Sequence, residues 1–157
     1  MSTQAFSLQT DGPAHSIAAP VGTDGNIQVI SFFAPVKNAA DYTRVEFYDD
    51  IGNVLLHLSF RPKQGFVAIN AKEAGGSFDG KNEIRVDFAQ HLPPSKVAQF
   101  RVTDTGPDYQ ISFSDGPGVE FHKLREIAQN KVSSVAYLHG DGLSVLSNPL
   151  NVHTFTA

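Results

Sequence analysis

The chain has 157 residues, of which 41% are hydrophobic and 18% charged, and its formal net charge is −4. This composition is typical of one globular domain, spanning 1–157, that is long enough to bury a core. The negative charge argues against nucleic acid as a partner. No apolar run approaches the roughly 18 residues that span a bilayer, so we expect no membrane insertion. The lack of cysteine excludes disulfides and cysteine metal sites.

Short runs of alternating apolar residues, separated by turn residues, extend along the whole chain. Turn residues are dense at 11–13, 23–26, 49–53, 75–80, 106–108, 115–118 and 140–142. Apolar residues recur every second position at 45–47, 67–69, 84–88, 97–102 and 111–113, and only 121–129 has a helix-like spacing. Short strands between such turns predict an all-β sandwich or barrel. The strands expected at 6–9 and 151–156 should pair near the termini, where they could form a dimer edge.

The first residues carry no targeting signal. Met1 to Phe6 lacks the basic start and apolar core of a secretory signal peptide, and no Asn-x-Ser/Thr acceptor occurs in the chain. We therefore expect a protein that is cytoplasmic or is secreted without a signal peptide.

The stretch 55–61 places two chemistries on opposite faces of one strand. Because side chains alternate, Leu56, Leu58 and Phe60 should face the core. His57, Ser59 and Arg61 then form a polar row on the other face. Solubility alone would not select these three residues, so the row predicts a surface for a polyhydroxylated ligand.

The next two strands extend this polar row. Asn70 should point outward beside it, and Glu83 and Arg85 should do the same on the following strand, where Ile84, Val86 and Phe88 point inward. Glu83 could accept hydrogen bonds from both Arg61 and Arg85 and so fix the two guanidinium groups. The alternative is a simple cross-strand ion-pair network on a solvated surface.

Phe78 lies in the long loop 71–82 and offers a flat apolar surface for the C–H face of a sugar ring. The other histidines, His15, His91, His122, His139 and His153, have no metal-site spacing, so we expect no metal and no cofactor.

The run His57-x-Ser59-x-Arg61, then Asn70, Phe78 and Glu83-x-Arg85, resembles the sugar-binding signature of galectins, and 55–61 is most similar to mushroom galectins. The similarity extends over nearly the whole chain, including 17–21, 30–33, 92–102, 109–113, 119–121 and 132–137. It implies a two-sheet antiparallel jelly-roll sandwich.

The chain departs from the family pattern at two site positions. Ser59 replaces an Asn, and Phe78 replaces a Trp in a loop about two residues longer than usual. Some mushroom members that lack the Asn recover its contact from a preceding loop. Here the loop 35–42 offers only Asn38, Asp41 and Tyr42 as weak candidates.

The resemblance implies a non-catalytic lectin for β-galactoside-containing glycans. His57 and Arg61 would bind the axial hydroxyl and the ring oxygen, and Asn70 the primary hydroxyl. Phe78 would stack on the ring, while Glu83 and Arg85 would reach the next sugar. We expect a shallow, water-exposed groove of modest affinity, which a homo-oligomer, such as a dimer, would turn into multivalent binding.

Two alternatives remain beside this interpretation. The altered positions could shift specificity to chitooligosaccharides or other N-acetylated glycans, or leave an interaction module that binds no sugar. A glycosidase is disfavoured, because Glu83 is the only carboxylate expected in the patch and its arginine neighbours would lower its pKa.

Overall fold

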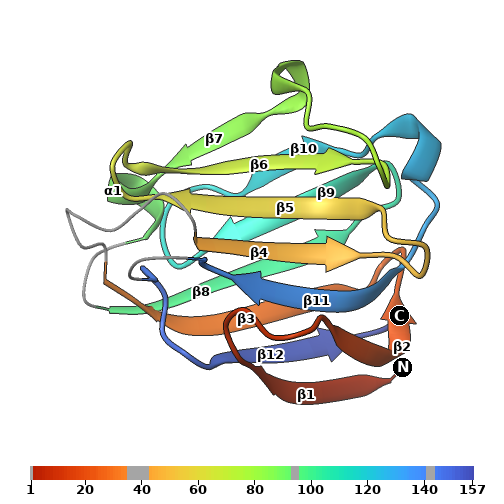
Figure 1. The fold of residues 1–157 in the computed structure, drawn as a ribbon, viewed down its shortest axis with the longest axis horizontal. Helices are drawn as coiled ribbons and strands as arrows, with labels where there is room; N and C mark the ends of the chain where they lie inside the picture. Colours follow the sequence, from red (N-terminus) through yellow and green to blue (C-terminus); the bar gives the residue numbers. More distant parts are fainter. Residues whose placement is uncertain (1, 35–42, 93–95, 141–143) are drawn as a thin grey trace.

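The computed structural model describes residues 2–34, 43–92, 96–140 and 144–157 and shows two antiparallel six-stranded sheets packed face to face (Figure 1). This confirms the expected two-sheet antiparallel sandwich. In the described ranges the helical elements are short: η1 Gly80–Asn82, α1 Phe88–His91 and η2 Arg125–Ile127. None of the helices described is long and apolar enough to span a bilayer.

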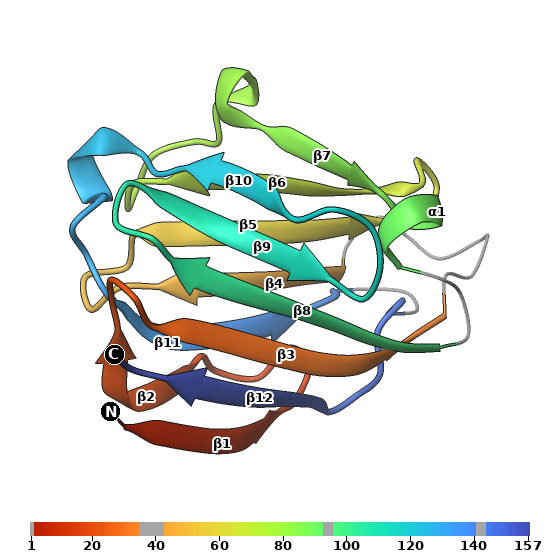
Figure 2. The same ribbon diagram turned by 180° about the vertical axis from the view of Figure 1, so that it is seen from behind.

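The first sheet lies behind in Figure 1 and in front in Figure 2. Its strands run in the order β1-β12-β3-β8-β9-β10. Their bounds are Thr3–Leu8 for β1, Leu150–Phe155 for β12, Asn26–Phe33 for β3, Lys96–Asp104 for β8, Asp108–Phe113 for β9 and Val119–His122 for β10.

The second sheet has the order β2-β11-β4-β5-β6-β7. Its strands are β2 His15–Val21, β11 Val132–Leu138, β4 Thr43–Tyr48, β5 Val54–Arg61, β6 Phe66–Lys72 and β7 Ile84–Asp87. The three strands that carry the expected polar residues, β5, β6 and β7, are therefore consecutive neighbours, as the sequence predicts.

The strands near the two termini pair as expected. β1 and β12 are antiparallel, with Thr3 opposite Phe155 and Leu8 opposite Leu150. The pairing continues past the strands, because the backbone N–H of Thr156 donates to the carbonyl of Ser2 at 2.9 Å. Both ends of the chain thus lie at one edge of the first sheet (Figure 1).

The core lies between the two sheets and is built from the inward positions of the alternating runs. Leu56, Leu58 and Phe60 of β5 are fully buried, as their spacing predicts. Phe60 faces Phe100 of β8 across the sandwich, with ring centroids 6.1 Å apart. Each such side chain contributes roughly 1.5–3 kcal/mol through its removal from water. This burial orients the opposite face of β5.

The third expected strand ends earlier than its alternation suggests. Phe88 is the first residue of α1 rather than a strand residue, because the carboxylate of Asp87 accepts from the backbone N–H of Gln90 at 2.8 Å and caps the turn. Phe88 still packs inward, edge-on to Phe33, with ring centroids 4.8 Å apart. The helix-like spacing at 121–129 corresponds to the end of β10 and the single turn of η2.

Candidate functional site

Strand register brings the expected polar residues onto one face of the second sheet. His57 of β5 lies opposite Asn70 of β6, and Ser59 lies opposite Ala68, which in turn lies opposite Arg85 of β7. Glu83 directly follows η1 and precedes β7. We call this face the β5–β7 surface, defined by His57, Ser59, Arg61, Asn70, Phe78, Glu83 and Arg85.

Glu83 joins the two arginines, as predicted. Its Oε2 accepts from Nε of Arg85 at 2.9 Å, and its Oε1 lies 3.5 Å from Nη2 of Arg61. Nε of Arg61 also donates to Oγ of Ser59 at 3.3 Å. The Phe66 ring lies 5.7 Å from the guanidinium carbon of Arg61 and 4.6 Å from that of Arg85. Arg61 is thus held on several sides before any ligand arrives.

Phe78 lies against His57, with ring centroids 4.3 Å apart and the planes tilted by 34°. The ammonium group of Lys72 lies 5.0 Å from the centroid of the Phe78 ring. Phe78 remains 37% exposed, so part of the ring is accessible. The loop therefore places an aromatic ring beside the polar row, as its position in the sequence predicts.

Asn70 ties this loop to the sheet. Its Nδ2 donates to the carbonyl of Asp79 at 2.9 Å, and its Oδ1 accepts from the backbone N–H of Ala71 at 2.8 Å. The side chain of Asp79 in turn caps η1 by accepting from the backbone N–H of Lys81. One amide hydrogen of Asn70 is left for a further acceptor.

The centre of the β5–β7 surface is not the shallow, exposed groove that we expected. His57 is 7% exposed, Ser59 4% and Asn70 3%. For His57 and Asn70 the reason is that the loop before β7 folds back, so that Phe78 packs on the His57 ring while Asn70 bonds to the loop. Arg61 and Glu83 are half-buried, and Arg85 is exposed.

A second carboxylate lies on the same face, which corrects the expectation that Glu83 is the only one. Glu46 of β4 is opposite His57, and its Oε2 lies 2.7 Å from Nδ1 of His57. Its Oε1 accepts from the hydroxyl of Tyr48 at 2.8 Å. Burial alone would raise the pKa of Glu46, but hydrogen bonds from His57 and Tyr48, with the charge of Arg44, lower it below its usual value.

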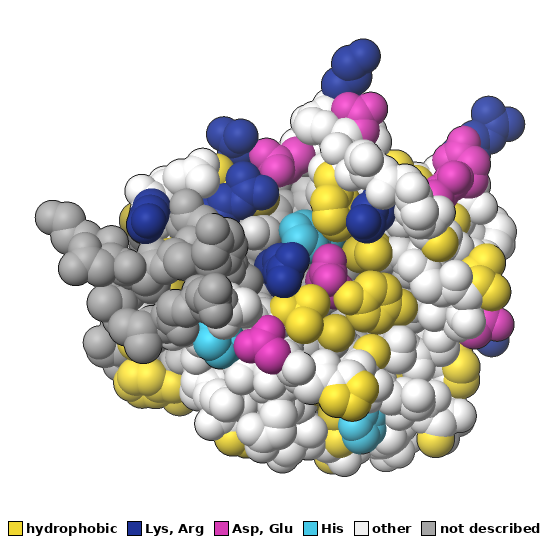
Figure 3. Space-filling model, in the orientation of Figure 1, with side chains coloured by type: hydrophobic (Ala, Val, Ile, Leu, Met, Phe, Trp, Pro, Cys, Tyr) yellow, Lys and Arg dark blue, Asp and Glu magenta, His cyan; other side chains and the backbone are white. Residues whose placement is uncertain are grey.

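Arg44, Glu46 and Tyr48 lie outside the galectin-like motif, but the sequence contains a signal for them. Val45 and Phe47 are buried core residues, so Arg44, Glu46 and Tyr48 alternate with them and face the same side as His57. Arg44 lies opposite Ser59, and its Nε is buried without a hydrogen-bond partner among the described residues. Figure 3 shows acidic, basic and histidine side chains gathered over β4–β6.

The described part of the chain contains no group of three or more His, Asp or Glu placed to hold a metal ion. Asn38, Asp41 and Tyr42 lie outside the described residues.

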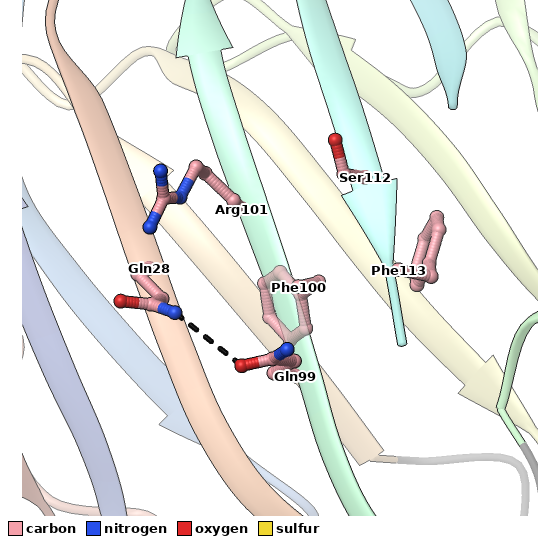
Figure 4. A pocket seen from close by; sticks show the side chains of 6 residues that line it. All are labelled: Gln28, Gln99, Phe100, Arg101, Ser112 and Phe113. Atoms are coloured by element: carbon pink, nitrogen blue, oxygen red, sulfur yellow. Dashed lines mark hydrogen bonds between the residues drawn. The ribbon is translucent and has the colours of Figure 1, made fainter. Parts of the chain in front are cut away.

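A separate hollow of about 250 Å³ lies on the outer face of the first sheet (Figure 4). Its polar lining comes from Gln28 of β3, Gln99 and Arg101 of β8, and Ser112 of β9. Nε2 of Gln28 donates to Oε1 of Gln99 at 3.3 Å. None of the residues predicted to bind a ligand lies there.

Comparison with known proteins agrees with this arrangement. No family model matches the chain. Galectin-2 of Coprinopsis cinerea is 28% identical over 100 residues, which cover 64% of this chain and 61% of that protein. The match therefore spans less than two thirds of the relative's length.

Solved structures of galectins have the same fold. A Caenorhabditis elegans galectin, LEC-6, superposes with a TM-score of 0.69 at 11% identity, over 96% of this chain and 94% of that one. Chicken galectin 2 superposes with a TM-score of 0.61 at 14% identity, over 87% of this chain and 95% of that one. A toad ovary galectin in complex with thio-digalactose superposes with a TM-score of 0.55 at 14% identity, over 98% of this chain and 95% of that one. At these identities the solved structures show the fold alone, and the fungal match adds a sequence similarity to a galectin over part of the chain.

Proposed function

We propose that this protein is a non-catalytic lectin that binds β-galactosides at the β5–β7 surface. The observation that carries the proposal is the guanidinium of Arg61, which is held between Ser59 and Glu83 on the strand that also carries His57. A fixed fork of donors beside a histidine and an exposed aromatic face suits a ligand with hydroxyls on one side and C–H groups on the other. The toad ovary galectin, which shares the fold, is complexed with thio-digalactose.

Each side chain has a role in this proposal. Arg61 and His57 bind the axial hydroxyl and the ring oxygen of galactose. Asn70 uses its remaining amide hydrogen for the primary hydroxyl, and the exposed part of Phe78 packs on the sugar ring. Arg85, exposed and oriented by Glu83, reaches the second sugar.

The carboxylates of this face favour binding over glycoside hydrolysis. A glycosidase needs a carboxylic acid with a raised pKa opposite a second carboxylate. The pKa of Glu46 is lowered by its hydrogen bonds from His57 and Tyr48, which outweigh the opposing effect of burial. Glu83 lies between two guanidinium groups, and both of its carboxylate oxygens contact them.

Multivalency is the second part of the proposal. A single site of this kind binds weakly, because each hydrogen bond to a sugar replaces one to water. A homo-oligomer would raise the avidity by presenting two or more sites. β1 and β2 are edge strands of the two sheets on the side remote from β7, so a dimer formed there leaves the β5–β7 surface open (Figure 1).

One observation favours a shifted specificity as the second candidate. The Phe78 ring rests on His57 and is flanked by Lys72, so part of the surface that a galactose would use is occupied by the protein itself. A chitooligosaccharide or another N-acetylated glycan that approaches mainly from the Phe78 and Arg85 side would avoid this contact. A surface that binds no sugar and serves protein interaction would have the same geometry.

Isothermal titration calorimetry with lactose, run in parallel with an N-acetylchitooligosaccharide, tests the proposal. Saturable heat with lactose supports a β-galactoside lectin. Heat with the chitooligosaccharide alone keeps the lectin but changes its sugar. No heat with either ligand, for a protein that is folded by circular dichroism, contradicts sugar binding by these classes and favours the interaction module.

A further inference from the structure

The imidazole of His57 is held from one side by an acid that the motif does not include. Nδ1 of His57 lies 2.7 Å from Oε2 of Glu46, and both side chains are 9% exposed. The other carboxylate oxygen, Oε1, accepts from the hydroxyl of Tyr48. Both Glu46 oxygens are therefore engaged, which fixes the carboxylate relative to the ring.

A carboxylate accepts hydrogen bonds and cannot donate them, so the proton in this contact belongs to Nδ1 of His57. In a neutral imidazole the second nitrogen, Nε2, then carries a lone pair. Within the residues that the structure describes, Nε2 has no hydrogen-bond partner. Two cations lie near this pair: Arg44 on β4 acts on the charge of Glu46, and the ammonium group of Lys72 on β6 lies 5.0 Å from the centroid of the Phe78 ring that packs on His57.

An acceptor at this point changes what the site can recognise. Ser59 occupies the position between His57 and Arg61 on the same face, and its Oγ accepts from Nε of Arg61, which uses one of its two lone pairs. The donors of Arg61 can satisfy only lone pairs of a ligand oxygen, since guanidinium has no acceptor. A hydroxyl bound there therefore needs an acceptor for its own hydrogen, and Nε2 of His57 is suited to supply it.

We infer that Glu46 is a positioning residue that holds His57 as the Nδ1–H tautomer, so that the ligand group bound at His57 is a hydroxyl that donates its hydrogen to Nε2. The part concerning the ligand rests on the proposed function. The tautomer is a property of the free protein and can be tested without any sugar.

Long-range ¹H–¹⁵N correlation spectra of the free protein at pH 7.5 test the tautomer. The resonances of His57 are assigned through a His57→Gln variant, which removes them from the set of six histidines. The expected result is a protonated Nδ1 and an unprotonated Nε2. A protonated Nε2, with or without a proton on Nδ1, would overturn the inference whether or not lactose binds.

Glu46→Gln then tests the acid itself. In Glu46→Gln the amide oxygen can keep the hydrogen bond from the Tyr48 hydroxyl, which turns the amide NH2 toward Nδ1 of His57. Nδ1 then accepts and the proton moves to Nε2, so the spectrum should move toward the opposite tautomer. Glu120→Gln, an exposed change on β10 of the other sheet, is the matched control and should leave the His57 resonances in place. An unchanged His57 spectrum in folded Glu46→Gln contradicts the inference, and Tyr48→Phe, which keeps the carboxylate, should retain the wild-type tautomer.

Titration with lactose and with its analogue carrying fluorine in place of the axial galactose hydroxyl tests the ligand part. Fluorine cannot donate, so the wild type should bind the analogue about tenfold more weakly or worse, the equivalent of one lost hydrogen bond. In Glu46→Gln, lactose should bind about tenfold more weakly, and the penalty for fluorine should fall to about two- to threefold. If fluorine weakened binding by the same factor in the wild type and in Glu46→Gln, the result would contradict donation of the ligand hydroxyl to Nε2 of His57. Absence of lactose binding to the wild type would instead contradict the proposed function and leave the spectra to decide on the tautomer.

Discussion

The outer faces of the two sheets both carry arginine and amide side chains, but they hold them differently. On the β5–β7 surface, Arg61 contacts Ser59 and Glu83, and Asn70 bonds to its own loop. On the outer face of the first sheet, Gln99 is exposed and shares one hydrogen bond with Gln28, while Arg101 makes no ion pair within the described residues. The difference is in preorganisation rather than in polarity.

Preorganisation decides which face can bind an uncharged ligand. Ordering a long side chain on binding costs about 0.5–1.5 kcal/mol, which is comparable to the net gain from one hydrogen bond. Side chains already fixed by the protein avoid most of this loss. We therefore expect the β5–β7 surface to bind sugar and the hollow around Arg101 to bind none.

Replacing one arginine on each face is the strongest test of this comparison. Arg61→Ala should lower lactose affinity by more than about a hundredfold, since it removes charge-assisted donors at the centre of the surface. Arg101→Ala should leave the affinity unchanged. Calorimetric titration of both variants measures this, with circular dichroism to establish folding. Retained affinity in folded Arg61→Ala would mean that sugar binds elsewhere.

A matched pair of asparagine variants should differ in stability. Asn70→Ala leaves the carbonyl of Asp79 and the N–H of Ala71 without their partners, so the free energy of unfolding should fall by about 1–3 kcal/mol. Asn151→Ala, at an exposed position of β12, should change it by less than about 0.5 kcal/mol. Urea denaturation gives both values. Similar losses in the two variants would show that Asn70 does not support the loop.

The pH dependence of stability tests Glu46. Its pKa is lowered in the folded protein, so its contribution to stability is present above its ordinary pKa of 4.5 and is lost as the pH falls through the lower, folded value. Between pH 5.5 and 3, the free energy of unfolding should therefore fall less in Glu46→Gln than in the wild type. Denaturant midpoints at several pH values measure this, with Glu120→Gln to show the effect of losing one carboxylate elsewhere. If the free energy of unfolding changed with pH in the same way in wild type and Glu46→Gln, the hydrogen bonds of Glu46 would not stabilise the folded protein.

Enlarging the aromatic ring should have the smallest effect. Phe78→Trp offers a wider, more electron-rich face, so lactose affinity should rise about threefold. Phe32→Trp makes the same change at an exposed position of β3 in the first sheet and should leave affinity unchanged. Weaker binding of lactose by Phe78→Trp would indicate that a larger ring blocks His57, in favour of a different sugar.

Most of the fold could be predicted from the sequence because the alternation of apolar residues is a local property. The burial of Leu58 and the outward direction of His57 follow from the alternation of side chains along a strand alone. The bridge from Arg61 through Glu83 to Arg85 could also be predicted, because the three strands follow one another in the chain and in the sheet. The early end of β7 at Asp87 does not follow from the apolar alternation, although Asp87 three residues before Gln90 is a capping pattern.

The surroundings of His57 could not be predicted in the same way. Whether Glu46 contacts His57 depends on the register of β4 against β5. A shift of one residue in this register would place Glu46 on the opposite face of the sheet. The low exposure of His57 and Asn70 depends on how the loop with Phe78 folds back, and no periodic pattern encodes that. These contacts are non-local, and they leave His57 and Asn70 nearly buried where the sequence predicted an exposed groove.

The hydrogen bond between Thr156 and Ser2 has a practical consequence. Both termini leave the molecule at the edge formed by β1 and β12, on the side of the sandwich opposite β7 (Figure 2). Attachment to a sensor chip or bead through either end would therefore leave the β5–β7 surface facing the solution. A short peptide joining the two ends would close the chain into a ring without crossing that surface, and the ring would raise stability by restricting the unfolded chain.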